Sequence, residues 1–193
     1  MSTNIVRCGW AGNDPLYVAY HDTEWGIPTY DDKVLFERLM LEGFQAGLAW
    51  ITILRKREGF FRAFNGWDPE TISAYGPKEI ARLMDNPGII RNRLKVNGAV
   101  TNARAFLAFE NAGESFSDML WSFVDGAPIV NQPAALADVP VSTPEAAAMS
   151  KELKRRGFTF VGPTICYAFM QSAGMVDDHI TDCSYKQRQP AAT

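Results

Sequence analysis

The chain has 193 residues, 47% of them hydrophobic and 21% charged, so it can bury a core without disulfides. A net charge of −3 argues against a protein that coats nucleic acid by charge alone, although basic stretches such as residues 91–95 remain available. No apolar run reaches the roughly 20 residues of a membrane span, and the first residues carry no signal core. We therefore expect a single cytoplasmic domain over residues 1–193, monomeric and without a membrane partner.

Signals that begin helices recur along the chain: an N-capping residue or a glycine followed by proline at the first helical position. They occur at residues 14–15, 68–69, 76–77 and 143–144, and Asp31 and Ser115 are further capping residues. The apolar residues between them recur at helical spacing. The glycines expected to end helices are Gly43, Gly113, Gly157 and Gly174. Because no stretch alternates like a hairpin strand, the sequence predicts an all-α fold of about eight to ten short helices.

The C-terminal third contains a candidate helix–hairpin–helix over about residues 143–174. A Pro- and Ala-rich connection precedes it, with one helical turn expected at 134–136. Two predicted helices then flank a short turn that has Gly157 and Gly162 at its ends. Such a turn can direct backbone N–H groups and a helix N-terminus toward a phosphate. An ordinary helical hairpin is the alternative.

Both histidines and two of the three cysteines lie near the chain ends. Cys8 and His21 are close together in sequence, and His179 and Cys183, spaced i and i+4, would share a face if their segment were helical. Together they supply the four N and S ligands that tetrahedral zinc requires, which would close the site and make the metal structural. The third cysteine, Cys166, lies in an apolar stretch typical of a core. The alternative is four unrelated buried residues.

A glutamate at the end of an apolar helical run is a candidate binding group. Glu42 follows three apolar residues, and such a carboxylate needs a partner. The exocyclic amine of a flipped purine could donate to it, and Tyr17, Tyr20, Trp25 and Trp50 could stack on the base. The alternative is an aromatic core and an exposed glutamate.

Taken together, these segments resemble the 3-methyladenine DNA glycosylase I family. The resemblance covers about residues 7–185. The segments that carry it are Arg7-Cys8-Gly9-Trp10, residues 14–26, Leu41-Glu42-Gly43 through Trp50, residues 88–95, Trp121-Ser122-Phe123-Val124, residues 154–167 and Asp178-His179.

The resemblance implies the helix–hairpin–helix DNA glycosylase fold, with one structural Zn²⁺ per chain that joins residues 7–25 to residues 175–185. It implies that the protein flips 3-methyladenine out of alkylated double-stranded DNA and releases it hydrolytically as the free base. No lysine lies in residues 17–25 or 42–50, so no Schiff base and no lyase chemistry are expected. One alternative is a non-catalytic, zinc-stabilised module that binds damaged DNA. Another is a structural zinc protein that binds a protein partner through its aromatic face.

The resemblance also implies individual residue roles. The zinc ligands are Cys8, His21, His179 and Cys183; Glu42 is catalytic and contacts the base with Tyr20, Trp50, Tyr17 and Trp10; and the DNA contacts are Gly157, Phe160, Val161, Gly162, Gln45 and Gly47. Residues 45–48 form the expected wedge into the duplex. Asp177 stands near the place where many relatives in the superfamily carry an essential aspartate, but this family does not depend on one, so Asp177 is not assigned. Phe44 is bulkier than expected beside the wedge.

Overall fold

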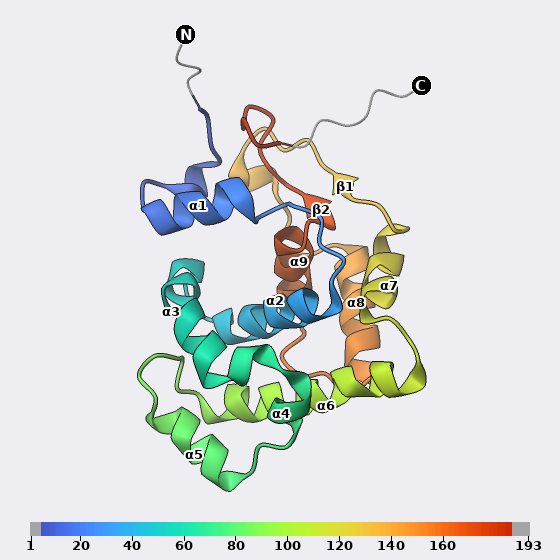
Figure 1. Ribbon diagram of the computed structural model, residues 1–193. Helices are drawn as coiled ribbons and strands as arrows, with labels where there is room; N and C mark the ends of the chain where they lie inside the picture. Colours follow the sequence, from blue (N-terminus) through green and yellow to red (C-terminus); the bar gives the residue numbers. More distant parts are fainter. Residues whose placement is uncertain (1–4, 187–193) are drawn as a thin grey trace.

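The structure, a computed structural model, describes residues 5–186, and most of this part of the chain is helical (Figure 1). None of the helices in these residues combines the length and apolar character that crossing a membrane requires. In chain order the elements are η1 (Gly9–Ala11), α1 (Pro15–Thr23), α2 (Asp32–Gln45), α3 (Trp50–Ala63), η2 (Asn65–Trp67), α4 (Pro69–Ser73), α5 (Pro77–Asp85), α6 (Arg93–Ala112), α7 (Phe116–Trp121), η3 (Ser122–Val124), β1 (Ile129–Val130), η4 (Leu136–Asp138), α8 (Pro144–Arg155), α9 (Pro163–Ser172) and β2 (Val176–Asp177), where η denotes a 3-10 turn.

Local capping determines where most helices begin. The Asp14 carboxylate accepts a hydrogen bond from the Leu16 N–H at the start of α1, and the Thr143 hydroxyl accepts one from the Ala146 N–H at the start of α8. Proline occupies the first turn of α1, α4, α5, α8 and α9. The predicted starts of α1, α2, α4, α5, α7 and α8 are therefore confirmed.

Glycine ends three of the four predicted helices. Gly113, Gly157 and Gly174 follow α6, α8 and α9 with φ of +69°, +93° and +72°. The predicted stop at Gly43 is wrong, because α2 continues to Gln45. Gly43 serves close packing instead, since a Cβ there would lie 3.4 Å from the Cβ of Phe160.

A small sheet modifies the all-α expectation. Ile129 pairs with Val176 in two short parallel strands, β1 and β2. After β2 the described chain is irregular, so His179 and Cys183 do not share a helix face. The predicted turn at 134–136 appears two residues later, as η4.

Helix α2 crosses the middle of the molecule and contacts α3, α6, α7 and α9 (Figure 1). Because neighbours surround its C-terminal half, every residue from Leu39 to Phe44 is buried, and Glu42 is among them. The fold thereby holds a carboxyl group inside an apolar environment.

Gly174 should tolerate a side chain much less well than Gly113. Both have positive φ, but an alanine Cβ at Gly174 would lie 2.2 Å from the Ile27 carbonyl carbon, whereas nothing lies within 4 Å at Gly113. We expect Gly113→Ala to lower the free energy of unfolding by about 1–2 kcal/mol, the cost of left-handed backbone. Gly174→Ala should cost clearly more, because backbone must also move. Urea denaturation measures both, and equal losses would contradict the close approach.

Candidate functional site

A cavity of about 210 Å³ lies where both halves of the chain meet. The residues that line it are Trp10, Tyr17, Tyr20, Trp25, Glu42, Gln45, Trp50, Leu136, Ala168 and Gln171. They come from η1, α1, α2, α3, η4 and α9, together with the segment after α1. The structure thus brings all five predicted base-contacting residues to one cavity.

Aromatic rings form much of the cavity wall. The ring centroids of Trp10 lie 5.1 Å from those of Tyr17 and 4.9 Å from those of Trp25, and the Tyr20 and Trp50 rings are 5.5 Å apart. The indole N–H of Trp50 is buried and has no hydrogen-bond partner among residues 5–186. Flat apolar walls with a spare donor suit a planar heteroaromatic ligand.

Glu42 is the acidic group of this cavity, and only 4% of its surface is exposed. Burial raises the pKa of its carboxyl group to about 8, against the opposing effects of a hydrogen bond with Ser172 and the positive charge of Arg38. Near neutral pH the carboxyl is therefore largely protonated in the ligand-free protein. A cationic ligand would favour the carboxylate, which then accepts a charge-assisted hydrogen bond.

Sequence reasoning missed three cavity residues, Leu136, Ala168 and Gln171. The side-chain amide of Gln171 donates to Asp178 Oδ2 over 2.7 Å, and the Tyr167 hydroxyl donates to the same oxygen over 2.6 Å. The three-residue spacing of Ala168 and Gln171 on α9 is the only signal the sequence offers for their shared face. Leu136 has no such signal, because the η4 turn reaches the cavity through tertiary packing.

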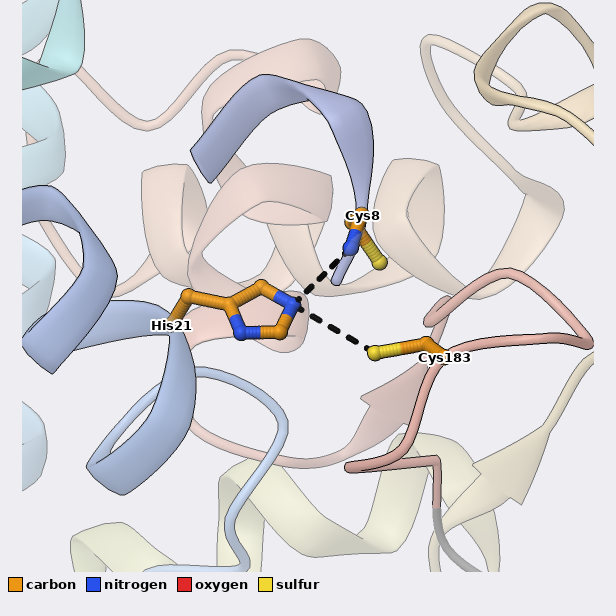
Figure 2. A group of neighbouring side chains, drawn as sticks. All are labelled: Cys8, His21 and Cys183. Atoms are coloured by element: carbon orange, nitrogen blue, oxygen red, sulfur yellow. Dashed lines mark hydrogen bonds between the residues drawn. The ribbon is translucent and has the colours of Figure 1, made fainter. Parts of the chain in front are cut away.

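A second cluster lies beside the cavity, where the two ends of the described chain meet. Cys8, His21 and Cys183 are buried, and their ligand atoms all lie within 4.8 Å of one another (Figure 2). His21 Nε2 lies 3.5 Å from Cys183 Sγ and 3.4 Å from the backbone nitrogen of Cys8. Backbone hydrogen bonding between Val6 and Ser184 joins the same two segments over 2.9 Å.

His179, the fourth predicted ligand, falls outside that group of three but packs against it. Its ring centroid is 5.0 Å from that of His21, and its Nε2 atom is buried without a partner in the described part of the chain. Each histidine has a carboxylate on its other nitrogen: His21 Nδ1 lies 2.8 Å from Asp22 Oδ1, and His179 Nδ1 lies 2.7 Å from Asp177 Oδ1. Because a carboxylate only accepts, both Nε2 atoms are left as lone-pair donors.

The unassigned Asp177 therefore orients His179. It also accepts from the His179 backbone N–H over 3.0 Å, is fully buried, and does not line the cavity. Phe44, the other departure, lies in the core, 4.6 Å from the Phe60 ring centroid. The core therefore accommodates the large side chain of Phe44.

The predicted DNA contacts lie in two loops. In the first, residues 45–48, the Gln45 side chain lines the cavity and its amide donates to the Leu48 carbonyl over 2.6 Å, while Gly47 is exposed with φ +82°. In the second, residues 157–162, Gly157 is exposed and nothing lies within 4 Å of a Cβ placed on Gly162.

Two of the predicted DNA contacts in the second loop are partly or wholly buried. Phe160 is half-buried, with φ +56°. Val161 is 1% exposed, and its carbonyl accepts from the Ser150 hydroxyl over 2.6 Å. The Val161 side chain is therefore not available to contact DNA.

A mostly helical scaffold with an aromatic cavity and a buried acid fits a DNA glycosylase, and the comparisons with known proteins agree. A model of the methyladenine glycosylase family matches residues 10–187, so the chain belongs to that family. It is 51% identical over 179 residues to DNA-3-methyladenine glycosylase 1 of Escherichia coli (strain K12), covering 93% of this chain and 96% of that protein.

Solved structures lead to the same family. A crystal structure of 3-methyladenine DNA glycosylase I superposes with a TM-score of 0.92 at 54% identity and covers 93% of this chain and 98% of that one. A tyrosine-to-phenylalanine variant of 3-methyladenine DNA glycosylase I, in complex with 3-methyladenine, has a TM-score of 0.91 at 39% identity, with coverages of 95% and 99%.

Replacing Glu42 by glutamine should change how stability depends on pH. In the wild type the carboxyl pKa rises from 4.5 to about 8 on folding, so its neutral form favours the folded state. That contribution is complete below pH 4.5 and is lost as the pH rises through 8. The glutamine has no such pH dependence, so we expect Glu42→Gln to become more stable than wild type by a few kcal/mol as the pH rises between these two values.

Denaturation of the ligand-free protein from pH 4.5 to 9 measures this difference. Glu58→Gln is the matched control, because the side chain of Glu58 is 70% exposed. A stability difference between wild type and Glu42→Gln that stays constant with pH would show that the carboxyl is solvated.

Proposed function

We propose that the chain is a base-excision repair glycosylase that flips 3-methyladenine out of alkylated double-stranded DNA and releases it as the free base. The observation that carries the proposal is the buried Glu42 carboxyl in an aromatic-walled cavity. A cavity of about 210 Å³ suits a single base rather than a base pair. The proposal is supported by the similarity to the E. coli DNA-3-methyladenine glycosylase 1 and to the structure of a related enzyme in complex with 3-methyladenine.

Glu42 recognises the charge of the substrate. Methylation at N3 makes the adenine of DNA cationic, and the Glu42 carboxylate accepts a hydrogen bond from its exocyclic amine. The Tyr20 and Trp50 rings stack on the base and add a cation–π contribution of about 0.5–2 kcal/mol. These interactions offset the few kcal/mol that unstacking costs. Tyr17 and Trp10 complete the aromatic wall.

Hydrolysis needs little further chemistry from the protein. The bond between the sugar C1′ and the base nitrogen breaks, and its electron pair neutralises the base. Water then forms the new bond to C1′ and loses a proton. Within residues 5–186 no lysine lines the cavity, which supports simple hydrolysis over Schiff-base chemistry.

The two loops hold the duplex in this proposal. Gly157 through Gly162 grip the phosphate backbone through N–H groups, and Gln45 and Gly47 lie in the wedge that enters the gap left by the base. Backbone contacts of this kind explain how a chain with a net charge of −3 can hold DNA. We propose that the protein works as a monomer of one helix–hairpin–helix domain in the cytoplasm, where bacterial DNA lies.

The residues near the chain ends fit a structural zinc ion. Two buried cysteines, two histidine Nε2 atoms and a carboxylate behind each histidine form a donor set of the kind that zinc prefers. The unpartnered Nε2 of His179 supports its inclusion as the fourth ligand with Cys8, His21 and Cys183. Four protein ligands leave no position for water, so the metal would tie the two segments together and take no part in hydrolysis.

Purified protein should hold one zinc ion per chain. Cys183→Ser removes a ligand, so we expect zinc content to fall well below one and the thermal midpoint to drop. Cys166→Ser is the matched control, because Cys166 is also buried but lies outside the cluster. It should keep its zinc even if packing suffers. The assignment would be wrong if metal analysis found no zinc in the wild type, or one zinc ion per chain in Cys183→Ser.

Methylated DNA should release 3-methyladenine in the presence of this protein, as measured by chromatography of the freed bases. Glu42→Gln loses a charge-assisted bond of about 1.5–3 kcal/mol, so we expect a roughly ten- to hundredfold weaker affinity for free 3-methyladenine and slower release. Trp50→Ala should also weaken base affinity, through lost stacking.

Circular dichroism and zinc content should be unchanged in Glu42→Gln. If wild type binds methylated DNA without freeing any base, the protein is the non-catalytic damage-binding module instead.

A further inference from the structure

Three residues on one face of α6 contact the two loops proposed to hold DNA. Lys95, Gly98 and Asn102 are spaced i, i+3 and i+7, which places them on the same side of the helix. All three are buried. They contact the 45–48 loop at one end and the 157–162 loop further along α6.

Lys95 binds the C-terminal end of α2, where the 45–48 loop begins. Its ammonium group donates to the Phe44 carbonyl over 2.9 Å and to the Ala46 carbonyl over 2.7 Å. Only 9% of the residue is exposed. A positive charge at these terminal carbonyls is favourable because the partial negative charge of the helix dipole lies there. Lys95 lies in the basic stretch 91–95, but its hydrogen bonds go to backbone carbonyls of the protein itself.

Asn102 hydrogen-bonds to the 157–162 loop through both the nitrogen and the oxygen of its side-chain amide. Its Nδ2 donates to the Thr159 carbonyl over 3.0 Å, and its Oδ1 accepts from the Thr159 backbone N–H over 2.7 Å. The amide thus satisfies both backbone polar groups of Thr159, as a neighbouring β-strand would. These hydrogen bonds fix the backbone one residue before Phe160, which has the rare φ of +56°.

Phe160 connects this loop to both helices. A Cβ on Gly98 of α6 would lie 2.7 Å from the Phe160 ring, and a Cβ on Gly43 of α2 would lie 3.4 Å from its Cβ. Phe160 therefore packs against two glycines, with its ring on Gly98 and its Cβ on Gly43. Because α2 continues into the 45–48 loop, a shift of Phe160 or of the end of α2 would change the spacing between the loops.

We propose that this face of α6 sets the spacing and orientation of the two DNA-contacting loops, and that Lys95 is a positioning residue for the wedge. The inference rests on the proposed function, because it assumes that both loops meet one duplex. A duplex is stiff, so two loops engage it together only when their separation matches its geometry. Holding them in advance removes the cost of ordering them on binding.

Lys95→Met tests this, because it keeps most of the side-chain stem and removes the ammonium group. We expect single-turnover release of 3-methyladenine from duplex DNA to fall about 10- to 100-fold, the loss expected when a reacting group is misplaced by about an ångström. The affinity for free 3-methyladenine should stay within about twofold of wild type, because Lys95 does not line the cavity. Lys95→Arg, which keeps charge and donors, should recover part of the rate.

Lys56→Met is the matched control. Lys56 also donates to a backbone carbonyl, that of Pro87, over 2.6 Å, but it contacts neither loop. Its rate should equal that of wild type. The fluorescence of 2-aminopurine placed beside an abasic site gives a second readout, because a wedge that enters the duplex unstacks the probe. Lys95→Met should reduce this signal at saturating protein.

The outcomes separate the two proposals. If the wild type releases no 3-methyladenine, the proposed function itself is wrong. A wild-type rate and probe signal in Lys95→Met overturn the positioning role, and so does an equal loss of free-base affinity, which would place Lys95 in support of the cavity. If Lys95→Met does not fold, Lys95→Gln, which keeps one donor group, gives the same comparison.

Discussion

Burial of one carboxyl group is the constraint on which the site depends. Helix α2 is surrounded by other helices along its C-terminal half, so only 4% of the surface of Glu42 is exposed, and it faces the cavity. An ionised carboxylate is energetically unfavourable there, so burial raises the pKa of the carboxyl group to about 8. In the proposed function, a cationic base favours the ionised carboxylate, so binding the base also recognises its charge.

The aromatic wall and the joined chain ends both serve this cavity. Trp10 and Tyr17 belong to the N-terminal segment, and Cys8 and His21 of the same segment pack against residues that lie more than 150 positions later. An N-terminal segment of this kind has few partners of its own and would otherwise fray. Linking it to the C-terminal segment holds the aromatic residues beside Glu42.

The two loops proposed to meet DNA depend on the same core. The side chains of Lys95 and Asn102 donate hydrogen bonds to backbone carbonyls at the two loops. Phe160 packs with its ring on Gly98 and its Cβ on Gly43. Local sequence does not specify this arrangement, because each loop is shaped by a helix that lies far from it along the chain. The cavity and the loops are thus connected through α2, which carries Glu42 and leads into the first loop.

The sequence by itself determined the helix starts and the residue types of the site. A capping side chain such as that of Asp14 or Thr143 acts on N–H groups within three residues, so the necessary information is local. The same holds for Glu42 at the end of its apolar run. The pairing of distant cysteines and histidines could be proposed because zinc chemistry limits the choice of ligands.

Only the tertiary structure decided the rest. Gly43 does not end α2 because Phe160, more than 100 residues away, packs against it. Leu136 and Gln171 reach the cavity because η4 and α9 pack there, and no local pattern encodes such contacts. The segment that holds His179 is irregular because it pairs with β1 and with the N-terminal segment rather than with itself. Local rules fail at these positions because the free energy of long-range burial outweighs the few tenths of a kcal/mol of local preference.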